Sequence, residues 1–242
     1  GVLIDHARGL PVVAVAAIFQ HSPTVLLVRR NSGIETPQQL AGKRLMIGSG
    51  LSDAETLAML IGEGVMRHPP VILPHAHEIG PLLRGEVDAV SGYSTNEPLL
   101  TPDHGASLVQ FRPRQFGVDF YGDILVTHAD TARSRPDLVE AVNRAVRRGW
   151  VRAMADPGEA ADLIIARYSQ RKTRAQLLDE ASAMRDLILP DLIEIGHMNR
   201  GRWLHVGEIY RSVGLLPDNW SLDGFLFSDI REAERERGER WV

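Results

Sequence analysis

Three polar side chains with complementary chemistry follow one short apolar run near the middle of the sequence. Tyr93, Asn96 and Glu97 supply a hydroxyl, an amide and a carboxylate, and they come soon after the apolar residues of segment 87–90. A short apolar run of this kind is typical of a strand that a sheet buries on both faces. Ligands of open α/β sheets bind just beyond the carboxyl ends of the strands. The pattern therefore predicts a small-molecule site here, and a polar surface turn is the alternative.

A second polar loop consists of Gln20, His21 and Ser22, which follow the continuous apolar run 11–19. That run is best interpreted as another buried strand. We therefore expect these three side chains at the carboxyl end of a strand as well.

A third candidate is the glycine-rich turn 48–50, which contains Ser49 and leads from a predicted strand into a predicted helix. We expect Ser52 to cap that helix and Glu55 to complete a capping box. A strand, a turn and a helix start together expose backbone N–H groups, which suits an anion or the polar edge of a ligand. The glycine spacing matches neither the phosphate-binding loop nor the dinucleotide fingerprint, and a tight strand-to-helix turn is the alternative.

Segment 117–123 places carboxylates and aromatic rings between glycines, a pattern that indicates the wall of a site rather than a linker. Tyr121 and Asp123 need polar partners if they are buried. For Phe120, packing in the core is the alternative.

Metal binding and catalysis find little support in the sequence. His75 and His77 stand two positions apart, but no carboxylate cluster of recognisable spacing accompanies them, so we expect them in solvent. No nucleophile is paired with a base at a recognisable spacing. The sequence therefore predicts no metal site, no cofactor and no catalytic residue.

Strands and helices alternate in the first half of the sequence, and helices follow, which predicts an α/β fold with a three-layer lobe. Glycine and proline positions and the hydrophobic periods set the expected bounds. The expected strands are 11–19, 24–29, 44–47, 71–73, 87–92, 106–111 and 124–127, and the expected helices are 2–8, 36–40, 78–84, 135–150, 157–168, 173–188, 198–214 and 229–240.

Length and composition exclude several classes of protein. The 242 residues suffice for one large domain or two lobes, and a net charge of -4 gives no reason to propose nucleic acid as a partner. Without cysteine there are no disulfides, thiolate metal sites or cysteine nucleophiles. No run reaches the roughly 18 apolar residues of a membrane span. The sequence from Gly1 lacks the charged start and cleavage site of a signal peptide, which favours a mature or excised fragment.

Several motifs, in this order, resemble those of periplasmic solute-binding proteins related to the binding and synthesis of the thiamine pyrimidine precursor. This group is related to sulfonate-, taurine- and nitrate-binding proteins. The resemblance implies a type II periplasmic-binding-protein clamshell with two crossing strands and a ligand cleft between two lobes. Residues 1–35 and 119–242 would form lobe I and residues 36–118 lobe II. The segments that carry the resemblance are 18–23, 36–44, 85–98, 111–113, 120–125 and 196–199.

The resemblance also implies a function. It suggests a periplasmic or extracytoplasmic protein that binds a small polar ligand, a pyrimidine-like thiamine precursor or a related compound. The protein would serve either as the substrate-binding component of an ABC transporter, with its permease as partner, or as a sensor domain with a fused or adjacent membrane signalling domain. Segments 196–201 and 222–225 are similar to members fused to histidine kinases or cyclic-dinucleotide enzymes.

Two features depart from the family pattern. Family members usually begin with a strand and helix pairs before the position of Gly1, so we expect the N-terminal part of one lobe to be missing. The pyrimidine synthases of the group share a cysteine-rich motif, and this sequence has no cysteine. A synthase-like enzyme is therefore the alternative that we favour less, and a module that works only through protein contacts is a third.

In this interpretation one set of side chains binds the ligand. We expect Glu97 to accept hydrogen bonds from an amino or ring N–H of the ligand. Hinges are expected near residues 28–33 and 117–124. The expected ligand-binding residues are Gln20, His21, Ser22, Ser49, Tyr93, Asn96, Glu97, Tyr121 and Asp123.

Overall fold

The computed structural model describes residues 1–48, 53–103 and 105–239. The chain divides into two compact units, which are described separately. The first unit contains residues 1–20, 121–155 and 188–242, and the second contains residues 21–120 and 156–187.

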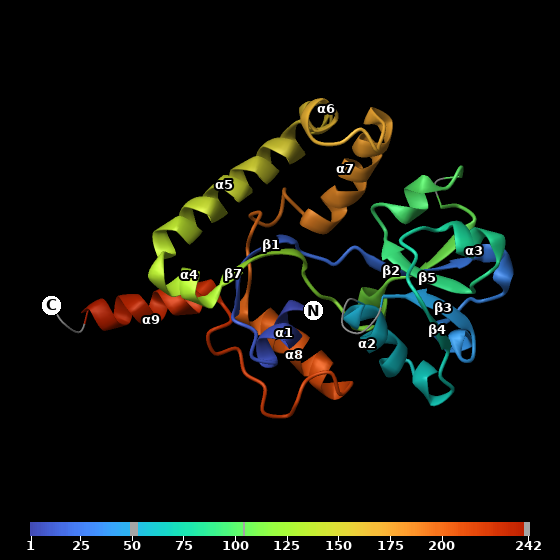
Figure 1. Ribbon diagram of the computed structural model, residues 1–242, viewed down its shortest axis with the longest axis horizontal. Coiled ribbons are helices and arrows are strands. Elements are labelled where there is room, and N and C mark those ends of the chain that lie inside the picture. The colour runs from blue at the N-terminus through green and yellow to red at the C-terminus, as the bar shows by residue number, and fades with distance from the viewer. Residues whose placement is uncertain (49–52, 104, 240–242) are drawn as a thin grey trace. The chain divides into compact units, whose positions relative to one another are not determined.

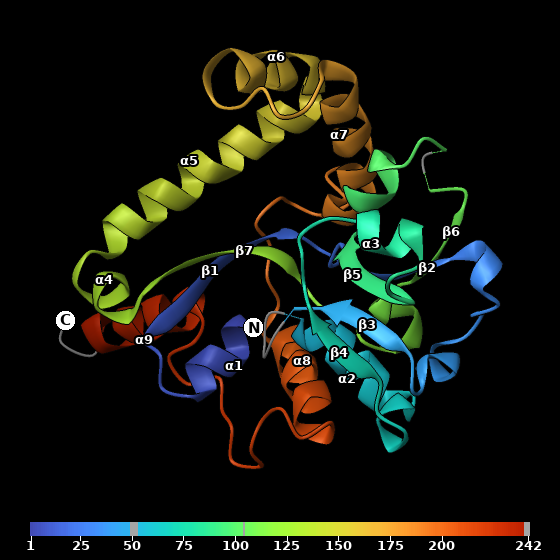
Figure 2. The same cartoon turned by 45° about the vertical axis from the view of Figure 1, so that its right-hand side comes forward.

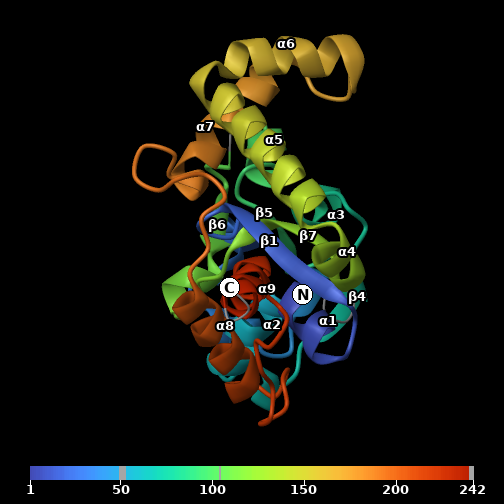
Figure 3. The same cartoon turned by 90° about the vertical axis from the view of Figure 1, so that its left-hand side faces the viewer.

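An antiparallel pair of strands forms the centre of the first unit. β1 is buried along almost its whole length and pairs with β7 from Val12 opposite His128 to Phe19 opposite Gly122, with a register shift between Ala14 and Ala16. Figure 3 shows the helices α1, α4, α5 and α9 around β1. The elements of this unit are α1 (Val2–Ala7), β1 (Val12–Phe19), β7 (Gly122–His128), α4 (Ala129–Ser134), α5 (Pro136–Ala155), α8 (Arg200–Ser212) and α9 (Phe227–Glu239).

Apolar side chains from distant parts of the sequence fill the core of the first unit. Val13 and Val15 of β1 pack against Val139 of α5 and Phe227 of α9. Around α8, the Trp203 ring meets Phe225 edge-on, with 4.9 Å between the ring centroids.

A five-stranded mixed sheet forms the centre of the second unit, in the order β4-β3-β5-β2-β6 (Figure 2). β3 runs parallel to β4 and β5, whereas β2 runs antiparallel to β5 and β6. The strands are β2 (Thr24–Arg29), β3 (Arg44–Ile47), β4 (Val71–Pro74), β5 (Ala89–Tyr93) and β6 (Leu108–Phe111).

Helices and 3₁₀ turns, the latter labelled η, connect these strands (Figure 1). Val25, Leu27, Val90 and Leu82 are among the side chains that form the core beneath α3. The elements between the strands are η1 (Arg30–Ser32), η2 (Pro37–Leu40), α2 (Ala54–Gly62), η3 (Val65–Arg67), α3 (Gly80–Arg84) and η4 (Glu97–Leu100). η5 (Pro113–Phe116) follows β6, and the later helices α6 (Pro157–Arg167) and α7 (Arg174–Ile188) lie almost wholly in this unit as well.

Local sequence signals account for several of these ends. Gly85 follows α3 with φ of 79°, the left-handed conformation that glycine adopts without a steric cost, as predicted. The predicted capping box of Thr36 and Gln39 is present, although the helix that it starts is a single 3₁₀ turn. The predicted strands and helices are all found, most with ends shifted by one to three residues.

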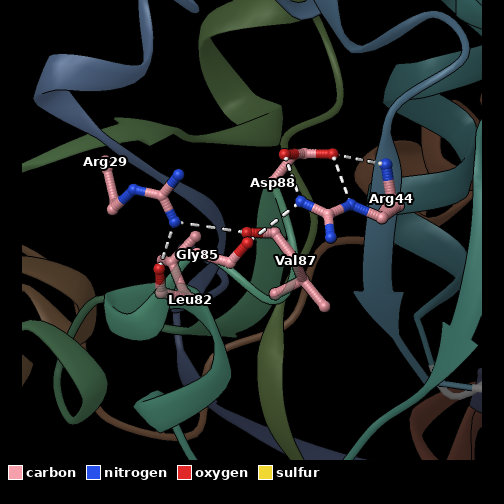
Figure 4. A network of polar contacts seen from close by, with 6 residues as sticks. All are labelled: Arg29, Arg44, Leu82, Gly85, Val87 and Asp88. Carbon is pink, nitrogen blue, oxygen red and sulfur yellow. Dashed lines mark hydrogen bonds and ion pairs between the residues drawn. The ribbon is translucent and has the colours of Figure 1, made fainter.

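Two arginines hold the turn that leads from α3 into β5 (Figure 4). Arg44 of β3 donates to both carboxylate oxygens of Asp88, at 3.1 and 3.0 Å, and to the Gly85 carbonyl at 3.0 Å. Arg29 donates through Nη1 to the carbonyl oxygens of Leu82, at 2.5 Å, and Val87, at 3.4 Å. These bonds fix the entry of β5, the strand that carries the predicted polar loop at its far end.

The two units differ from the predicted lobes mainly at residues 21–35 and 156–187, which belong to the second unit. β2 is an interior strand of the five-stranded sheet, so it packs with residues 36–118. Of the predicted hinge segments, 117–124 contains a passage between the units, whereas 28–33 lies within the second unit. The lobes as bodies that move stay a prediction. None of the described helices combines the length and the hydropathy that a membrane span requires.

Two glycines inside helices should respond oppositely to the same substitution. A Cβ on Gly207 of α8 would lie 2.0 Å from the Trp220 ring, so Gly207→Ala should lower the free energy of unfolding by about 1–3 kcal/mol. A Cβ on Gly149 of α5 would meet nothing, so Gly149→Ala should raise it by about 0.5–1 kcal/mol. Urea denaturation of both variants is the measurement, and a loss of stability in both would contradict the local packing described here.

Candidate functional site

The antiparallel register of β2 and β5 brings several strand ends to one edge of the second unit's sheet. Thr24 at the start of β2 lies opposite Tyr93 at the end of β5, and β3 runs parallel to β5. The loop before β2 and the loops after β3 and β5 therefore meet at the same edge. That is the position at which ligands of open α/β sheets bind.

The Glu97 side chain holds the loop after β5 in shape through hydrogen bonds within the loop. Glu97 Oε2 accepts a hydrogen bond from the Tyr93 amide at 2.6 Å, and Oε1 accepts one from Asn96 Nδ2 at 3.0 Å. Its side chain lies close to Gly92, because a Cβ there would come within 2.8 Å of the Glu97 carboxyl carbon. Glu97 thus shapes the loop, and each of its oxygens retains a lone pair for a further donor.

A lysine from the segment between α6 and α7 completes this loop. Lys172 Nζ donates to Asn96 Oδ1 at 2.8 Å and to Glu180 Oε2 at 2.6 Å. The Lys172 side chain is 32% exposed and that of Glu180 is 17% exposed. Because the lysine holds the amide oxygen of Asn96, the Asn96 nitrogen faces Glu97. Lys172 could not be predicted as a site residue, because its partner lies 76 positions away and no local pattern marks the pair.

The loop before β2 is held by the segment that precedes β7. His21 Nδ1 lies 2.7 Å from Asp119 Oδ1, and the Ser22 amide donates to the Phe120 carbonyl at 2.9 Å. Ser22 Oγ donates to Thr24 Oγ1 at 2.9 Å. His21 and Ser22 are therefore half-buried and fixed in orientation. Asp119 was not among the predicted site residues.

Two carboxyl groups stand where α2 begins. Asp53 Oδ2 accepts from Ser91 Oγ at 2.5 Å and from the Gly48 amide, so it links the ends of β3 and β5. Oε2 of Glu55 is buried and has no hydrogen-bond partner among the residues described. Burial raises the pKa of Glu55 to about 7, and the Ser22 hydroxyl acts in the opposite direction.

Sequence analysis assigned Glu55 to a capping box with Ser52 and not to the site. Ser52 and the predicted site residue Ser49 lie outside the described residues. The first described residue before α2, Asp53, occupies the N-cap position.

In the first unit, two predicted residues hold the segment before α8. Gln20 is buried and donates through Nε2 to the His197 carbonyl at 3.1 Å. The Tyr121 hydroxyl accepts from the Asn199 amide at 3.0 Å, and the Arg202 guanidinium lies 4.3 Å from the centre of the Tyr121 ring. Tyr121 is therefore a buried residue with the polar partner that its burial requires.

The remaining candidates lie on the surface or form local contacts. Asp123 is exposed and has φ of 47°. His75 Nε2 lies 2.7 Å from the Ser91 carbonyl oxygen, so His75 is half-buried rather than in solvent, whereas His77 is exposed. No group of three or more histidine, aspartate or glutamate side chains in the described parts of the chain could hold a metal ion.

The structure thus places His21, Ser22, Tyr93, Asn96 and Glu97 in the second unit, in the loops before β2 and after β5. In the first unit Gln20 and Tyr121 both contact the segment before α8, and Asp123 lies on the surface. Their roles in binding a ligand stay a prediction. Lys172 and Glu55 are the polar residues of the candidate site that were not predicted from the sequence, whereas Asp119 lies in segment 117–123, which was predicted to form the wall of a site.

Comparison with known proteins connects this geometry to one family. The model of the family described as NMT1/THI5 like matches residues 1–160. The riboflavin-binding protein RibY of Chloroflexus aurantiacus is 27% identical over 228 residues, which cover 89% of this chain and 63% of that protein. A putative thiamine biosynthesis protein of Haemophilus influenzae is 26% identical over 219 residues, 87% of this chain and 67% of that protein. The chain therefore spans about two thirds of the length of these relatives.

Solved structures show the same fold. The alkanesulfonate-binding protein SsuA from Xanthomonas axonopodis pv. citri, bound to MOPS, matches with a TM-score of 0.69 at 17% identity, covering 93% of this chain and 76% of that one. The desulfurization enzyme DSZB matches with a TM-score of 0.54 at 14% identity, covering 88% and 76%. The predicted α/β fold of periplasmic binding proteins is confirmed, and the fold includes an enzyme as well as binding proteins.

Replacing Lys172 tests the closure of the loop after β5. Lys172→Gln removes the positive charge that the half-buried Glu180 carboxylate and the Asn96 carbonyl share and shortens the side chain by one bond, so the free energy of unfolding should fall by about 1–3 kcal/mol. Arg174→Gln is the matched control, because Arg174 and Asp162 form an exposed pair whose removal should have no measurable effect. Equal stabilities of the two variants in urea would show that Lys172 does not hold the loop.

The pKa of Glu55 predicts a pH dependence of stability. An ordinary glutamate titrates near pH 4.5 in the unfolded chain and Glu55 near pH 7 in the folded protein, so the folded state binds more protons between these values. Wild-type stability should therefore decrease as the pH rises through this window, by up to about 3 kcal/mol from this group. In Glu55→Gln the decrease should be smaller by that amount. Parallel stability–pH curves for the two proteins would contradict the assignment.

Proposed function

Because the chain belongs to the NMT1/THI5-like family, we propose that it is a solute-binding protein that holds a small polar ligand in a cleft between two lobes. The observation that carries the proposal is the set of polar groups gathered at one sheet edge of the second unit. Loops from three strands supply them, and a network of hydrogen bonds and ion pairs fixes their orientation. Preformed polar groups of this kind suit recognition of one small molecule.

The chemistry of this edge favours a planar, nitrogen-containing ring as the ligand. Tyr93 is 55% exposed, and an exposed aromatic ring offers a stacking surface. Each Glu97 oxygen accepts one hydrogen bond and can accept another from an amino or ring N–H group, and the buried Glu55 Oε2 has no partner among the described residues. A pyrimidine-like thiamine precursor or a related heterocycle combines a ring and such donors. The names of the two relatives, one riboflavin-binding and one connected with thiamine, support the same class.

In this proposal the first and second units close on the ligand as the two lobes, and β2 moves with the second because it is an interior strand of that unit's sheet. His21 and Ser22 would contribute from the second unit, Gln20, Tyr121 and Asp123 would contribute from the first, and Ser49 would lie at the rim. A ligand that contacts both lobes favours the closed form by its differential affinity for it. Closure would be recognised by an ABC permease or transmitted to a membrane signalling domain, in the periplasm or another extracytoplasmic compartment.

A synthase-like enzyme is the alternative, and the fold of the enzyme DSZB is its main support. Two observations favour binding over catalysis. The sequence has no cysteine, and in the described residues the Ser22 hydroxyl is hydrogen-bonded to Thr24 and not to the adjacent His21 ring. Stoichiometric conversion of pyridoxal phosphate to a pyrimidine product would support the enzyme instead.

A thermal-shift screen separates these functions. The probes are riboflavin, the aminopyrimidine precursor of thiamine and MOPS, each with the full chain. A ligand that binds only the native state raises the melting temperature, and the rise grows with the logarithm of its concentration once that concentration exceeds Kd. A shift with one of the two heterocycles supports the proposal. A shift with MOPS alone would place the ligand among sulfonates, and no shift with any probe would favour the module that works only through protein contacts.

Glu97→Gln tests the site with the heterocycle that shifts the melting temperature. The glutamine can still accept from the Tyr93 amide, so the loop should persist, but the charge that attracts ligand N–H groups is lost. Affinity, measured by calorimetry, should fall about ten- to a hundred-fold. Glu86→Gln, at an exposed carboxylate paired with Arg84, should bind as the wild type does. Unchanged affinity in Glu97→Gln would remove Glu97 from the ligand's partners.

A further inference from the structure

A groove of about 430 Å³ lies in the second unit between the end of β2, α3 and the start of β6. Four of the side chains that line it can donate hydrogen bonds, and none is acidic. Arg29, Arg30 and Asn31 come from the end of β2 and η1, Ser107 precedes β6, and Leu83 of α3, 43% exposed, adds an apolar wall. A volume of this size matches small-molecule sites.

The groove is separate from the candidate site described above. Ser22 and Thr24 stand at the start of β2, whereas Arg29 ends the strand and Arg30 follows it. The five steps from Thr24 to Arg29 at about 3.3 Å each place the two ends of the strand about 16 Å apart. A ligand of the groove would therefore be a second ligand.

Arg29 is held by one nitrogen and offers the other two to the groove. Its Nη1 donates to the carbonyls of Leu82 and Val87, which fixes the plane of the guanidinium (Figure 4). Within the described ranges, Nε and Nη2 have no protein partner, and Arg29 forms no ion pair. These two nitrogens form the edge that binds two oxygens of a carboxylate or phosphate side by side.

Arg30 adds a second positive charge in a fixed position. Its Nε donates to the Ala106 carbonyl at 2.7 Å and its Nη2 to the Leu108 carbonyl at 2.9 Å, so Nη1 remains for another acceptor. The nearby acid Asp103 accepts from the amides of Gly105 and Ser107 and from the Thr101 hydroxyl. Both arginines therefore bond to neutral carbonyls, and their charges are not neutralised by a carboxylate in the described part of the chain.

We propose that this groove binds an oxyanion, a carboxylate or a phosphate, through the Nε–Nη2 edge of Arg29, with Arg30 and Asn31 as further donors. Holding arginines by backbone carbonyls orients them before the anion arrives and lowers the entropic cost of binding. The anion could be a free small molecule or an acidic side chain of a docking protein, and the chemistry of recognition is the same in both cases.

The test follows the side-chain Nε–H resonance of Arg29 in the ¹⁵N-labelled full chain. Sodium phosphate, sodium acetate and a tetraglutamate peptide are titrated separately, at an ionic strength held constant with sodium chloride. We expect a saturable shift of this resonance that chloride alone does not cause. Saturation by phosphate or acetate at lower concentration indicates a free anion, and saturation by the peptide first indicates an acidic segment of a protein.

Asn31 provides a matched pair of variants, because it is exposed and forms no hydrogen bond among the described residues. Asn31→Asp should weaken binding of the anion by about tenfold or more, and Asn31→Lys should strengthen it. Gln170→Glu adds the same negative charge outside the groove lining and should change nothing. No saturable shift, a shift that chloride reproduces, or equal affinities of the two Asn31 variants would overturn the proposal. This outcome is independent of the heterocycle screen, which reports on the other end of β2.

Discussion

The opposite directions of β2 and β5 are the constraint on which the arrangement of the second unit depends. Because Thr24 pairs with Tyr93, the loop that enters β2 and the loop that leaves β5 must lie side by side. The parallel pairing of β3 with β5 adds the start of α2 to the same edge. The inner strands β2, β3 and β5 are largely apolar and buried, so the sheet supplies a rigid frame and the loops supply the polar chemistry.

Local signals made most of the fold predictable from the sequence. Apolar runs marked the strands, helical periodicity marked the long helices, and Gly85 and Thr36 marked ends of elements, because each acts over only a few residues. The family resemblance placed these elements in the periplasmic-binding-protein fold. Two of the three polar loops, residues 20–22 and 93–97, could also be recognised from nearby residues alone, because a polar segment after an apolar run is a local pattern.

The contacts that give those loops their shape could not be predicted. Lys172 meets Asn96, and His21 meets Asp119, across separations of 76 and 98 residues, and no spacing rule connects such positions. The sequence predicted that Tyr121 would have a polar partner if it were buried, and it has one. The partner is the backbone amide of Asn199, which could not be predicted because almost any residue can supply such a donor. Glu97 shows the same limit, since its bonds to its own loop depend on a turn geometry that residue types alone do not determine.

The Trp220 ring occupies the place where a side chain of residue 207 would begin, and this contact restricts how the protein can evolve. Neither position can change freely while the other keeps its residue, because a larger residue at 207 collides with the ring and a smaller one at 220 leaves a void. Trp220 must therefore be replaced first, by a smaller residue that lowers stability but still allows the protein to fold. Once Trp220 is gone, a larger residue can replace Gly207. The two positions should therefore vary together among proteins that descend from this chain.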